Sequence, residues 1–329
     1  MLKTLLGLAL SIIATTSSPA ISQKITIEAV NEATWKSGKS GSTSPRLIRL
    51  QVLLDRAHAS PGAIDGQMGT NTRRAIAAFR EMSGEGDKGG EELDDQLWQT
   101  LTSQDQEPVL VRHVITDADV EGPFIEQMPT DFREMAKLDR MGFMSVQEKL
   151  AERFHMSEEL LRKLNPGAEF DKVGTEIVVA NVARKGLPGK VARLEVKQEQ
   201  VRAFDKDDRI IAIYPATIGS NERPSPTGEF KVAIADDPIF YYDPALNLQN
   251  VEAQEKLELP PGPNNPVGVV WISISAKGYG IHGTPHPEEV GKTASHGCIR
   301  LTNWDARELA KHVSKATTVS IPDAEGRAR

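Results

Sequence analysis

Apolar residues in the first third of the chain recur at helical spacing. Ser44 is a typical helix N-cap, and Leu47, Leu50 and Leu54 follow it on one helix face. Two further apolar stripes come after a glycine-containing turn, at Ala75, Ile76 and Phe79 and then at Leu97, Trp98 and Leu101. The pattern predicts a compact unit of three helices over residues 44–103.

The middle of the chain combines two helix starts with two strand-like runs. Ser145 and Glu148 form a capping box, and Ser157 caps a second helix. Runs typical of strands lie on either side of these helices, at residues 109–115 and 176–180. We therefore expect a strand–helix–helix–strand (βααβ) module, which together with a polar linker covers residues 104–183.

From about residue 188 the pattern changes to short strands. Alternating or wholly apolar runs occur at residues 192–196, 200–204, 209–216, 231–234, 269–275 and 317–321. One helix is indicated after Thr302, with Ala306 and Leu309 on its apolar face. Residues 236–263 are expected to be a long loop. The pattern predicts a mostly-β domain over residues 188–322, so the whole chain is a multidomain α + β protein.

The amino terminus has the plan of a signal peptide over residues 1–22. Lys3 is followed by an apolar run and then by small residues before Gln23. The apolar run is too short for a permanent span, so we expect export and no stable membrane anchor. The polar residues 23–43 are expected to be a flexible leader, and residues 323–329 a frayed tail.

The composition is that of an ordinary soluble protein, with 39% hydrophobic and 26% charged residues. The net charge of −7 argues against a nucleic-acid partner, because phosphates require basic surfaces. Composition thus points away from nucleic acid but does not identify a ligand.

The only cysteine among the 329 residues is Cys298, so no disulfide forms within the chain. Exported proteins usually pair their cysteines, and a thiol kept in such a compartment indicates chemistry. His282 stands 16 residues earlier, which is enough chain to place both side chains on adjacent strands. Backbone N–H groups around Gly297 and Cys298 could then face a developing oxyanion.

Three interpretations of this stretch compete. In the first, Cys298 is activated by His282 and carries out acyl transfer. In the second, Cys298 is a buried structural residue near solvated histidines. In the third, His282, His286, His296 and Cys298 bind a metal ion such as zinc.

The same stretch resembles the catalytic motif of the bacterial L,D-transpeptidases. The resemblance is carried by His282 and by Ser295-His296-Gly297-Cys298-Ile299, with Arg300 where asparagine is frequent in the family. It implies a nucleophile at Cys298, a general base at His282 and a backbone carbonyl at Gly283 that orients the imidazole. It implies no metal and no organic cofactor.

The resemblance also implies a fold and a reaction. The fold is a mixed β-sandwich with one main helix. The reaction is a transfer on peptidoglycan stem tetrapeptides, in which an acyl thioester forms, D-Ala leaves and 3-3 cross-links are made. Arg300, Ser295, His296 and Gly297 are then substrate-binding candidates, Arg300 through a substrate carboxylate. An L,D-carboxypeptidase, a protein-to-peptidoglycan ligase and an inactive wall-binding protein remain alternatives.

The two amino-terminal units resemble modules that bind the cell wall. Residues 44–103 are similar to the peptidoglycan-binding three-helix domain through Leu50-Gln51, Ile64-Asp65-Gly66 and Thr72. Residues 104–183 are similar to a degenerate LysM module through Leu150 to Phe154 and Leu164-Asn165-Pro166. The partners implied are peptidoglycan stem peptides and glycan, and the location implied is the periplasm or cell wall. Without a ligand, each unit would be a spacer.

Overall fold

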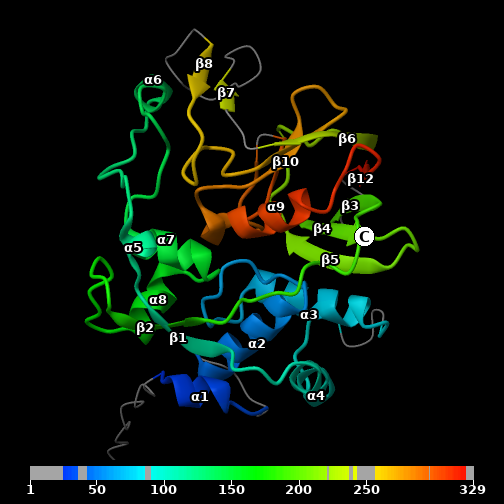
Figure 1. Ribbon diagram of the computed structural model, residues 1–329. Helices are drawn as coiled ribbons and strands as arrows, with labels where there is room; N and C mark the ends of the chain where they lie inside the picture. Colours follow the sequence, from blue (N-terminus) through cyan, green and yellow to red (C-terminus); the bar gives the residue numbers. More distant parts are fainter. Residues whose placement is uncertain are drawn as a thin grey trace, which may run out of the picture.

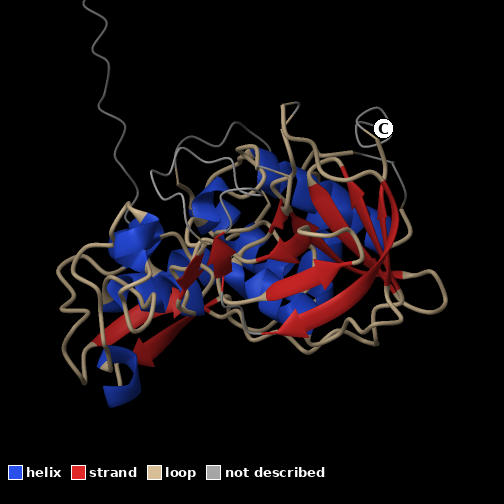
Figure 2. Cartoon of the chain, turned by 90° about the horizontal axis from the view of Figure 1, so that it is seen from above, coloured by secondary structure: helices blue, strands red, loops and turns tan. Residues whose placement is uncertain are grey.

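The computed structural model describes residues 25–35, 43–85, 90–220, 222–236, 240–242, 256–295 and 297–323. Helices and one strand pair from the amino-terminal half pack against a large sheet from the carboxyl-terminal half (Figure 1). Figure 2 shows the large sheet at one side of the molecule and the smaller strand pair at the other. No helix within these ranges is long and apolar enough to cross a membrane. The signal peptide expected over residues 1–22 lies outside the described residues.

The three predicted helices of the first unit are present. They are α2 (Pro45–Arg56), α3 (Thr70–Met82) and α4 (Asp95–Gln104). The Ser44 hydroxyl accepts a hydrogen bond from the N–H of Leu47, as its N-cap assignment required. Helix propensity, capping and the single buried apolar stripe of each helix therefore all favour the same three helices in this unit.

Gln51 of α2 ties the turn between α2 and α3 to the helix. Its amide oxygen accepts hydrogen bonds from the N–H groups of Asp65 and Gly66, at 3.2 and 2.7 Å. Its amide nitrogen donates to the carboxylate of Asp65 and the hydroxyl of Thr72, at 2.8 and 2.9 Å. The polar residues that carry the resemblance to a wall-binding module thus hold its turn together.

The leader predicted to be flexible is helical in part. α1 (Ile27–Asn31) packs Val30 into the core, where it is fully buried. The Asn31 side chain accepts hydrogen bonds from the N–H groups of Val109 and Leu110. The prediction was wrong for this part because it rested on the polar composition of residues 23–43 and missed two contacts distant in sequence.

The second unit contains the two strands and the two helices that were predicted, together with two further short helices. β1 (Leu110–Val114) pairs antiparallel with β2 (Glu176–Ala180), and α7 (Val146–Arg153) and α8 (Glu158–Leu164) lie between them in sequence. Ser145 and Ser157 cap these helices. Two short helices precede them, α5 (Asp117–Val120) and α6 (Phe132–Met135).

The two amino-terminal units share one hydrophobic core. Fully buried members of this core come from α1, from both units and from the large sheet, and they include Val30, Leu50, Ile76, Leu110, Leu161, Val179 and Ile213. We call residues 25–183 the accessory body, because the two units expected separately are packed into one. Ile213 lies in the large sheet, so this core continues onto the sheet's edge.

The large sheet has eight strands in the order β11-β10-β9-β6-β12-β3-β4-β5. The pairs β10–β11 and β12–β3 are parallel and the others antiparallel, so the sheet is mixed. One α-helix, α9 (Asn303–Ala310), follows β11 directly, as predicted. The strands are β3 (Arg193–Lys197), β4 (Gln200–Phe204), β5 (Ile210–Pro215), β6 (Gly228–Asp236), β9 (Trp271–Ile274), β10 (Gly280–His282), β11 (Ile299–Arg300) and β12 (Thr318–Ile321).

Chain beyond β5 returns to the opposite edge of the sheet. Thr217 and Arg300 exchange two backbone hydrogen bonds of 2.9 Å, and the N–H of Ser295 donates to the carbonyl of Ile218 at 2.7 Å. The chain that follows β5, at one edge of the sheet, is therefore hydrogen-bonded to β11 at the other edge and to Ser295.

The loop predicted over residues 236–263 contains two strands. β7 (Phe240–Tyr242) and β8 (Leu257–Leu259) pair antiparallel. The prediction of a long loop was therefore wrong for the residues of these two strands, because three-residue strands are too short to show a period in sequence. The 3-10 helix η1 (Pro287–Glu289) lies further on, between β10 and β11.

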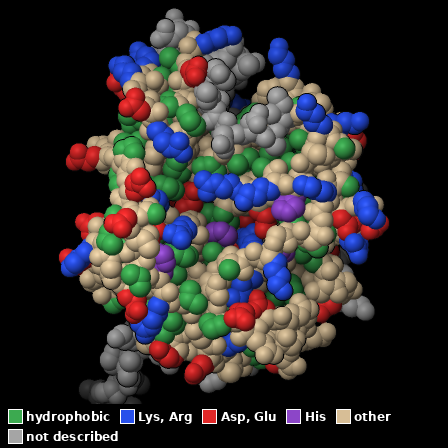
Figure 3. Space-filling view, viewed as in Figure 1, with side chains coloured by type: hydrophobic (Ala, Val, Ile, Leu, Met, Phe, Trp, Pro, Cys, Tyr) green, Lys and Arg blue, Asp and Glu red, His purple; other side chains and the backbone are tan. Residues whose placement is uncertain are grey.

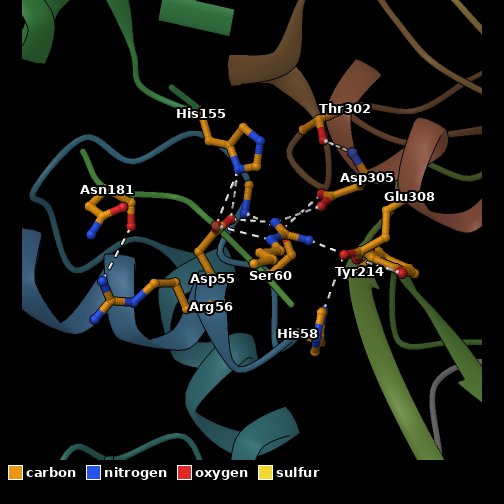
Figure 4. Close-up of polar contacts among 12 residues, drawn as sticks. Asp55, Arg56, His58, Ser60, His155, Asn181, Tyr214, Thr302, Asp305 and Glu308 are labelled. Carbon is orange, nitrogen blue, oxygen red and sulfur yellow. Dashed lines mark hydrogen bonds and ion pairs between the residues drawn. The ribbon is translucent and has the colours of Figure 1, made fainter. Parts of the chain in front are cut away.

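A buried ionic cluster joins the accessory body to α9 (Figure 4). Arg184, from the segment between β2 and β3, pairs with Asp55 of α2 and with Asp305 and Glu308 of α9. The distances to Asp305 and Glu308 are 3.2 and 2.8 Å. Asp55 and Asp305 are fully buried, so one guanidinium neutralises carboxylates from both parts of the molecule.

Neutral and weakly basic groups complete this cluster. The Ser60 hydroxyl donates to Asp305, and the Tyr214 hydroxyl of β5 donates to Glu308. His155 of the second unit contacts Asp55 through Nδ1 and stacks on Trp304 at 4.9 Å between ring centroids. Burial alone would raise the pKa of Asp55, but Arg184 and His155 lower it below its usual range.

Candidate active site

Register places the candidate side chains on one face of the sheet. β10 and β11 are parallel neighbours in which Ile281 is opposite Ile299 and His282 is opposite Arg300. Cys298 precedes β11, two positions before Arg300, and alternation along a strand puts it on the same face. Ile281 and Ile299 face the other way into the core, with at most 1% of their surface exposed. This arrangement brings Cys298, His282 and Arg300 together.

His282 is held as a neutral imidazole in one tautomer. Its Nδ1 lies 2.6 Å from the carbonyl oxygen of Gly283, so Nδ1 carries the hydrogen and Nε2 keeps a lone pair. The ring stacks on Trp271 of β9 at 5.4 Å between centroids. Burial lowers its pKa to about 3, and the charge of Arg300 adds to this, while the Gly283 carbonyl opposes it.

Cys298 is a partly exposed free thiol. Burial of the sulfur raises its pKa above the usual range, against weaker opposite effects of the Gly280 backbone and Arg300. At rest the Cys298 thiol and the His282 imidazole are therefore both uncharged. In such a pair the proton leaves sulfur when the nucleophile attacks.

Ser295 shapes the turn that presents the thiol. Its hydroxyl donates to the carbonyl of Cys298 at 2.5 Å and accepts from the N–H of Gly297 at 3.1 Å. Gly297 has φ +114°, and a Cβ there would lie 2.8 Å from Cε1 of Tyr279. The Gly297 N–H, a candidate oxyanion donor, is thus engaged within the turn. His296 lies outside the described residues.

Comparison with known proteins identifies the large-sheet domain. A family model of the YkuD type, an L,D-transpeptidase catalytic domain, matches residues 191–321. A Bacillus licheniformis protein named putative L,D-transpeptidase YkuD is 31% identical over 177 residues, which are 53% of this chain and 92% of that protein. This chain belongs to the L,D-transpeptidase family. It therefore carries the catalytic domain of a transferase.

Other L,D-transpeptidases match less of their own length. A probable L,D-transpeptidase ErfK/SrfK of Escherichia coli is 27% identical over 188 residues, which cover 54% of this chain and 59% of that protein. The solved structure of L,D-transpeptidase 3 from Mycobacterium tuberculosis with a faropenem-derived adduct has 19% identity and a TM-score of 0.33. That match covers 44% of this chain and 66% of the solved chain.

Arg300 of the transpeptidase domain is a partly buried cation. Burial lowers its pKa, and Cys298 and Glu289 offset this in part. Within the described ranges, its guanidinium has neither an ion-pair partner nor a hydrogen-bond partner. Among the described residues, Glu289 acts on the pKa of Arg300 through its charge but forms no salt bridge with it.

The metal interpretation of this stretch needs His296, which lies outside the described residues. The described residues contain no group of three or more His, Cys, Asp or Glu side chains able to hold a metal ion. His286 is largely exposed, and its Nδ1 lies 4.0 Å from a carboxylate oxygen of Glu288.

On the face shown in Figure 3, basic and acidic side chains are interspersed rather than gathered into a single-sign patch.

Sequence reasoning missed Asn303, which lies under the catalytic stretch. Asn303 is fully buried, and its Oδ1 accepts hydrogen bonds from the N–H groups of Val269 and Thr284 at 3.2 and 3.1 Å. Its Nδ2 donates to Glu152 of α7 at 2.7 Å. The only sequence signal was an asparagine at the first position of the predicted helix, which by itself indicates nothing beyond a helix start.

Proposed function

We propose that this enzyme is a peptidoglycan L,D-transpeptidase that works through an acyl thioester on Cys298 and forms 3-3 cross-links. The observation that carries the proposal is the pairing of β10 with β11. It sets a partly exposed thiol and a neutral imidazole of fixed tautomer on one face of the sheet. Membership of the chain in the L,D-transpeptidase family supports the choice of acyl transfer as the reaction.

In the acylation step, Nε2 of His282 takes the thiol proton as sulfur bonds to the carbonyl carbon of the third stem residue. We assign the stabilisation of the resulting oxyanion to the N–H of Cys298, because the N–H of Gly297 already donates a hydrogen bond to the Ser295 hydroxyl. The intermediate collapses, the bond to D-Ala breaks, and His282 returns the proton to the leaving amine. An acyl thioester remains on Cys298.

In the second step, an amine of another stem attacks the thioester carbonyl. His282 removes a proton from that amine and then protonates the departing sulfur, so the enzyme returns to its resting state. Water in place of the amine would make the enzyme an L,D-carboxypeptidase, and a protein lysine would make it a ligase. The chemistry at Cys298 is the same in all three cases.

Arg300 is assigned to a carboxylate of the stem peptide. A desolvated guanidinium that has no salt-bridge partner among the described residues is costly, and a substrate carboxylate would supply such a partner with matching geometry. Arg300 lies on the same face as Cys298, so the bound carboxylate would be near the reacting carbonyl. Ser295 and Gly297 contribute by shaping the thiol turn, and His296 stays a candidate from the sequence.

The accessory body is assigned to holding the enzyme on its polymeric substrate, in the periplasm or cell wall after export. Tethering to an insoluble polymer raises the effective concentration of the catalytic site at its substrate. Cosedimentation of the protein with purified cell-wall sacculi tests this. A protein that stays in the supernatant would leave the accessory body with a purely structural role.

Mass spectrometry of products from disaccharide-tetrapeptide tests the reaction, with Cys298→Ala as the control. Dimers joined between third-position residues, absent with the variant, are the expected result. Tripeptide alone, also lost in the variant, would replace the transpeptidase with the carboxypeptidase. No product with either protein would replace catalysis with the inactive wall-binding alternative.

A further inference from the structure

A single peptide group connects the catalytic imidazole to the side chain of Asn303. The carbonyl of the Gly283–Thr284 peptide accepts the hydrogen of His282 Nδ1 at 2.6 Å. The N–H of the same peptide donates to Asn303 Oδ1 at 3.1 Å. In a planar trans peptide the two groups point in opposite directions, so fixing the N–H fixes where the carbonyl points.

Asn303 is itself fixed by four hydrogen bonds. Its oxygen accepts from the N–H groups of Val269 and Thr284, and its nitrogen donates to Glu152 and to the carbonyl of Pro263. This uses both acceptor sites and both donor hydrogens of the amide. Because both neighbours of the oxygen are N–H donors, the amide has only one orientation that satisfies the network.

The backbone around Asn303 is adapted to this contact. A Cβ on Gly283 would lie 2.2 Å from Asn303 Oδ1, and one on Gly268 would lie 2.1 Å from it. Only glycine permits the approach at both positions. Glycine at positions 268 and 283 therefore leaves room for the Asn303 oxygen beside the peptide that holds His282.

The last link comes from the accessory body. Glu152 of α7 stands 151 positions from Asn303 in sequence, and its Oε2 accepts from Asn303 Nδ2 at 2.7 Å. The groups that face its carboxylate are Asn303 and Arg307 of α9 and Glu148 of its own helix. Arg307 is 3.8 Å away, so the contact with Asn303 is the closer one.

We propose that Asn303 and Glu152 are positioning residues for His282, which hold it in its reactive tautomer through the Gly283–Thr284 peptide. Glu152 anchors Asn303, Asn303 orients the peptide, and the peptide carbonyl keeps the hydrogen on Nδ1. The accessory body then contributes to the catalytic apparatus through Glu152, whether or not it binds the cell wall. The proposal rests on the proposed function only in naming His282 as the base.

The direct test is the tautomer of His282, read by ¹⁵N NMR of full-length protein with labelled histidine. The His282 signals are assigned by their absence from His282→Gln. We expect a protonated Nδ1 and a pyridine-like Nε2 in the wild type, and signals that move toward an average of both tautomers in Asn303→Ala and Glu152→Leu. A purely structural role would leave these shifts unchanged in a folded variant.

Kinetics with the tetrapeptide substrate provide the second readout. Loss of an anchoring hydrogen bond predicts a kcat lower by about ten-fold in Asn303→Ala and by about three-fold in Glu152→Leu. KM is expected to stay the same, because neither side chain is placed at the substrate. Glu152→Gln keeps an acceptor oxygen and should restore both kcat and the wild-type NMR signals. Glu159→Leu, the same change at an exposed glutamate of α8, is the matched control.

Glu152→Leu is expected to fold because an apolar residue replaces a buried carboxyl, and it decides the test if Asn303→Ala does not fold. Unchanged ring signals in a folded Glu152→Leu, with or without lost activity, would overturn the proposal. A wild-type His282 protonated on Nε2 would overturn it as well. Shifted ring signals in an enzyme that yields only tripeptide would support it while overturning the cross-linking function.

Discussion

Gly297 has a backbone conformation that other residues adopt only with strain. Its φ is +114°, and a Cβ would lie 2.8 Å from Tyr279 and 3.3 Å from the carbonyl oxygen of Pro224. We predict that Gly297→Ala costs about 1–3 kcal/mol of local strain and displaces the thiol turn, so that activity falls at least about ten-fold.

Gly84→Ala is the matched control for that substitution. Gly84 also has a positive φ, of +78°, but a Cβ there meets nothing within 4 Å. The Gly84→Ala variant should leave product formation unchanged and lower only the melting temperature of the protein. Equal activity of Gly297→Ala and wild type in the tetrapeptide assay would show that the turn does not set the position of the thiol.

The protonation states of Cys298 and His282 predict how the thiol reacts with alkylating agents. The pKa of Cys298 is raised, and that of His282 is lowered to about 3, so neither group is charged at neutral pH. The rate of alkylation by iodoacetamide should rise with pH through the neutral range and level off only above pH 9. A preformed thiolate–imidazolium pair would instead react at a constant high rate between pH 5 and 8. That high rate would be absent from the His282→Gln variant.

At the scale of elements, the contact between α7 and α9 predicts a pH dependence of stability. Burial raises the pKa of Glu152 to about 7 from 4.5, and hydrogen bonding by Asn303 and the charge of Arg307 only partly oppose this. The folded state therefore binds its proton more tightly than the unfolded state. Stability contributed by Glu152 is fully present below pH 4.5 and is lost as pH rises through 7, by roughly 3 kcal/mol.

Glu152→Gln removes the titration but keeps the acceptor oxygen. The difference in unfolding free energy between the variant and wild type, measured by urea denaturation, should grow in favour of the variant from pH 4.5 to pH 8. A difference that is constant across this range would mean that Glu152 titrates normally in the folded protein.

The elements that the sequence predicted well are those determined by neighbouring residues. Capping at Ser44, Ser145 and Thr302 marks helix starts, and apolar periods mark the strands and the helix faces. The elements that were missed depend on distant partners. α1 is fixed by contacts with β1, and β7 is paired with β8 across a long insertion.

The same distinction applies to the candidate site. Cys298 and His282 could be proposed because their residue types and spacing carry chemical information. Asn303 and Glu152 could not, because their contact spans 151 positions and neither residue lies in a motif. The family model does not supply Glu152 either, since it matches only residues 191–321.

At the scale of the whole molecule, Arg184 is the cation that joins the accessory body to α9. Removal of one partner from a buried ionic cluster leaves its carboxylates uncompensated, which typically costs about 3–5 kcal/mol. We predict this loss of unfolding free energy for Arg184→Ala, whose side chain is only 7% exposed.

The matched control for that variant is Arg112→Ala, because the Arg112–Glu176 pair is largely exposed. It should cost no more than about 1 kcal/mol. A shortened chain that begins at residue 188 lacks Arg184 and should be less stable than the full chain for the same reason. Equal urea midpoints for Arg184→Ala and Arg112→Ala would contradict the role assigned to the cluster.

The position of β12 has a consequence for the order in which the protein acquires its shape. β12 lies between β6 and β3, and so joins the half of the sheet that carries β10 and β11 to the half that contacts the accessory body. Synthesis delivers β12 after every other strand of the sheet, and pairing over such separations is slow. The accessory body can therefore assemble early, while the catalytic half stays incomplete until the strand nearest the carboxyl terminus is in place. Nascent chains cut short before residue 318 would contain a folded accessory body but an incomplete catalytic domain.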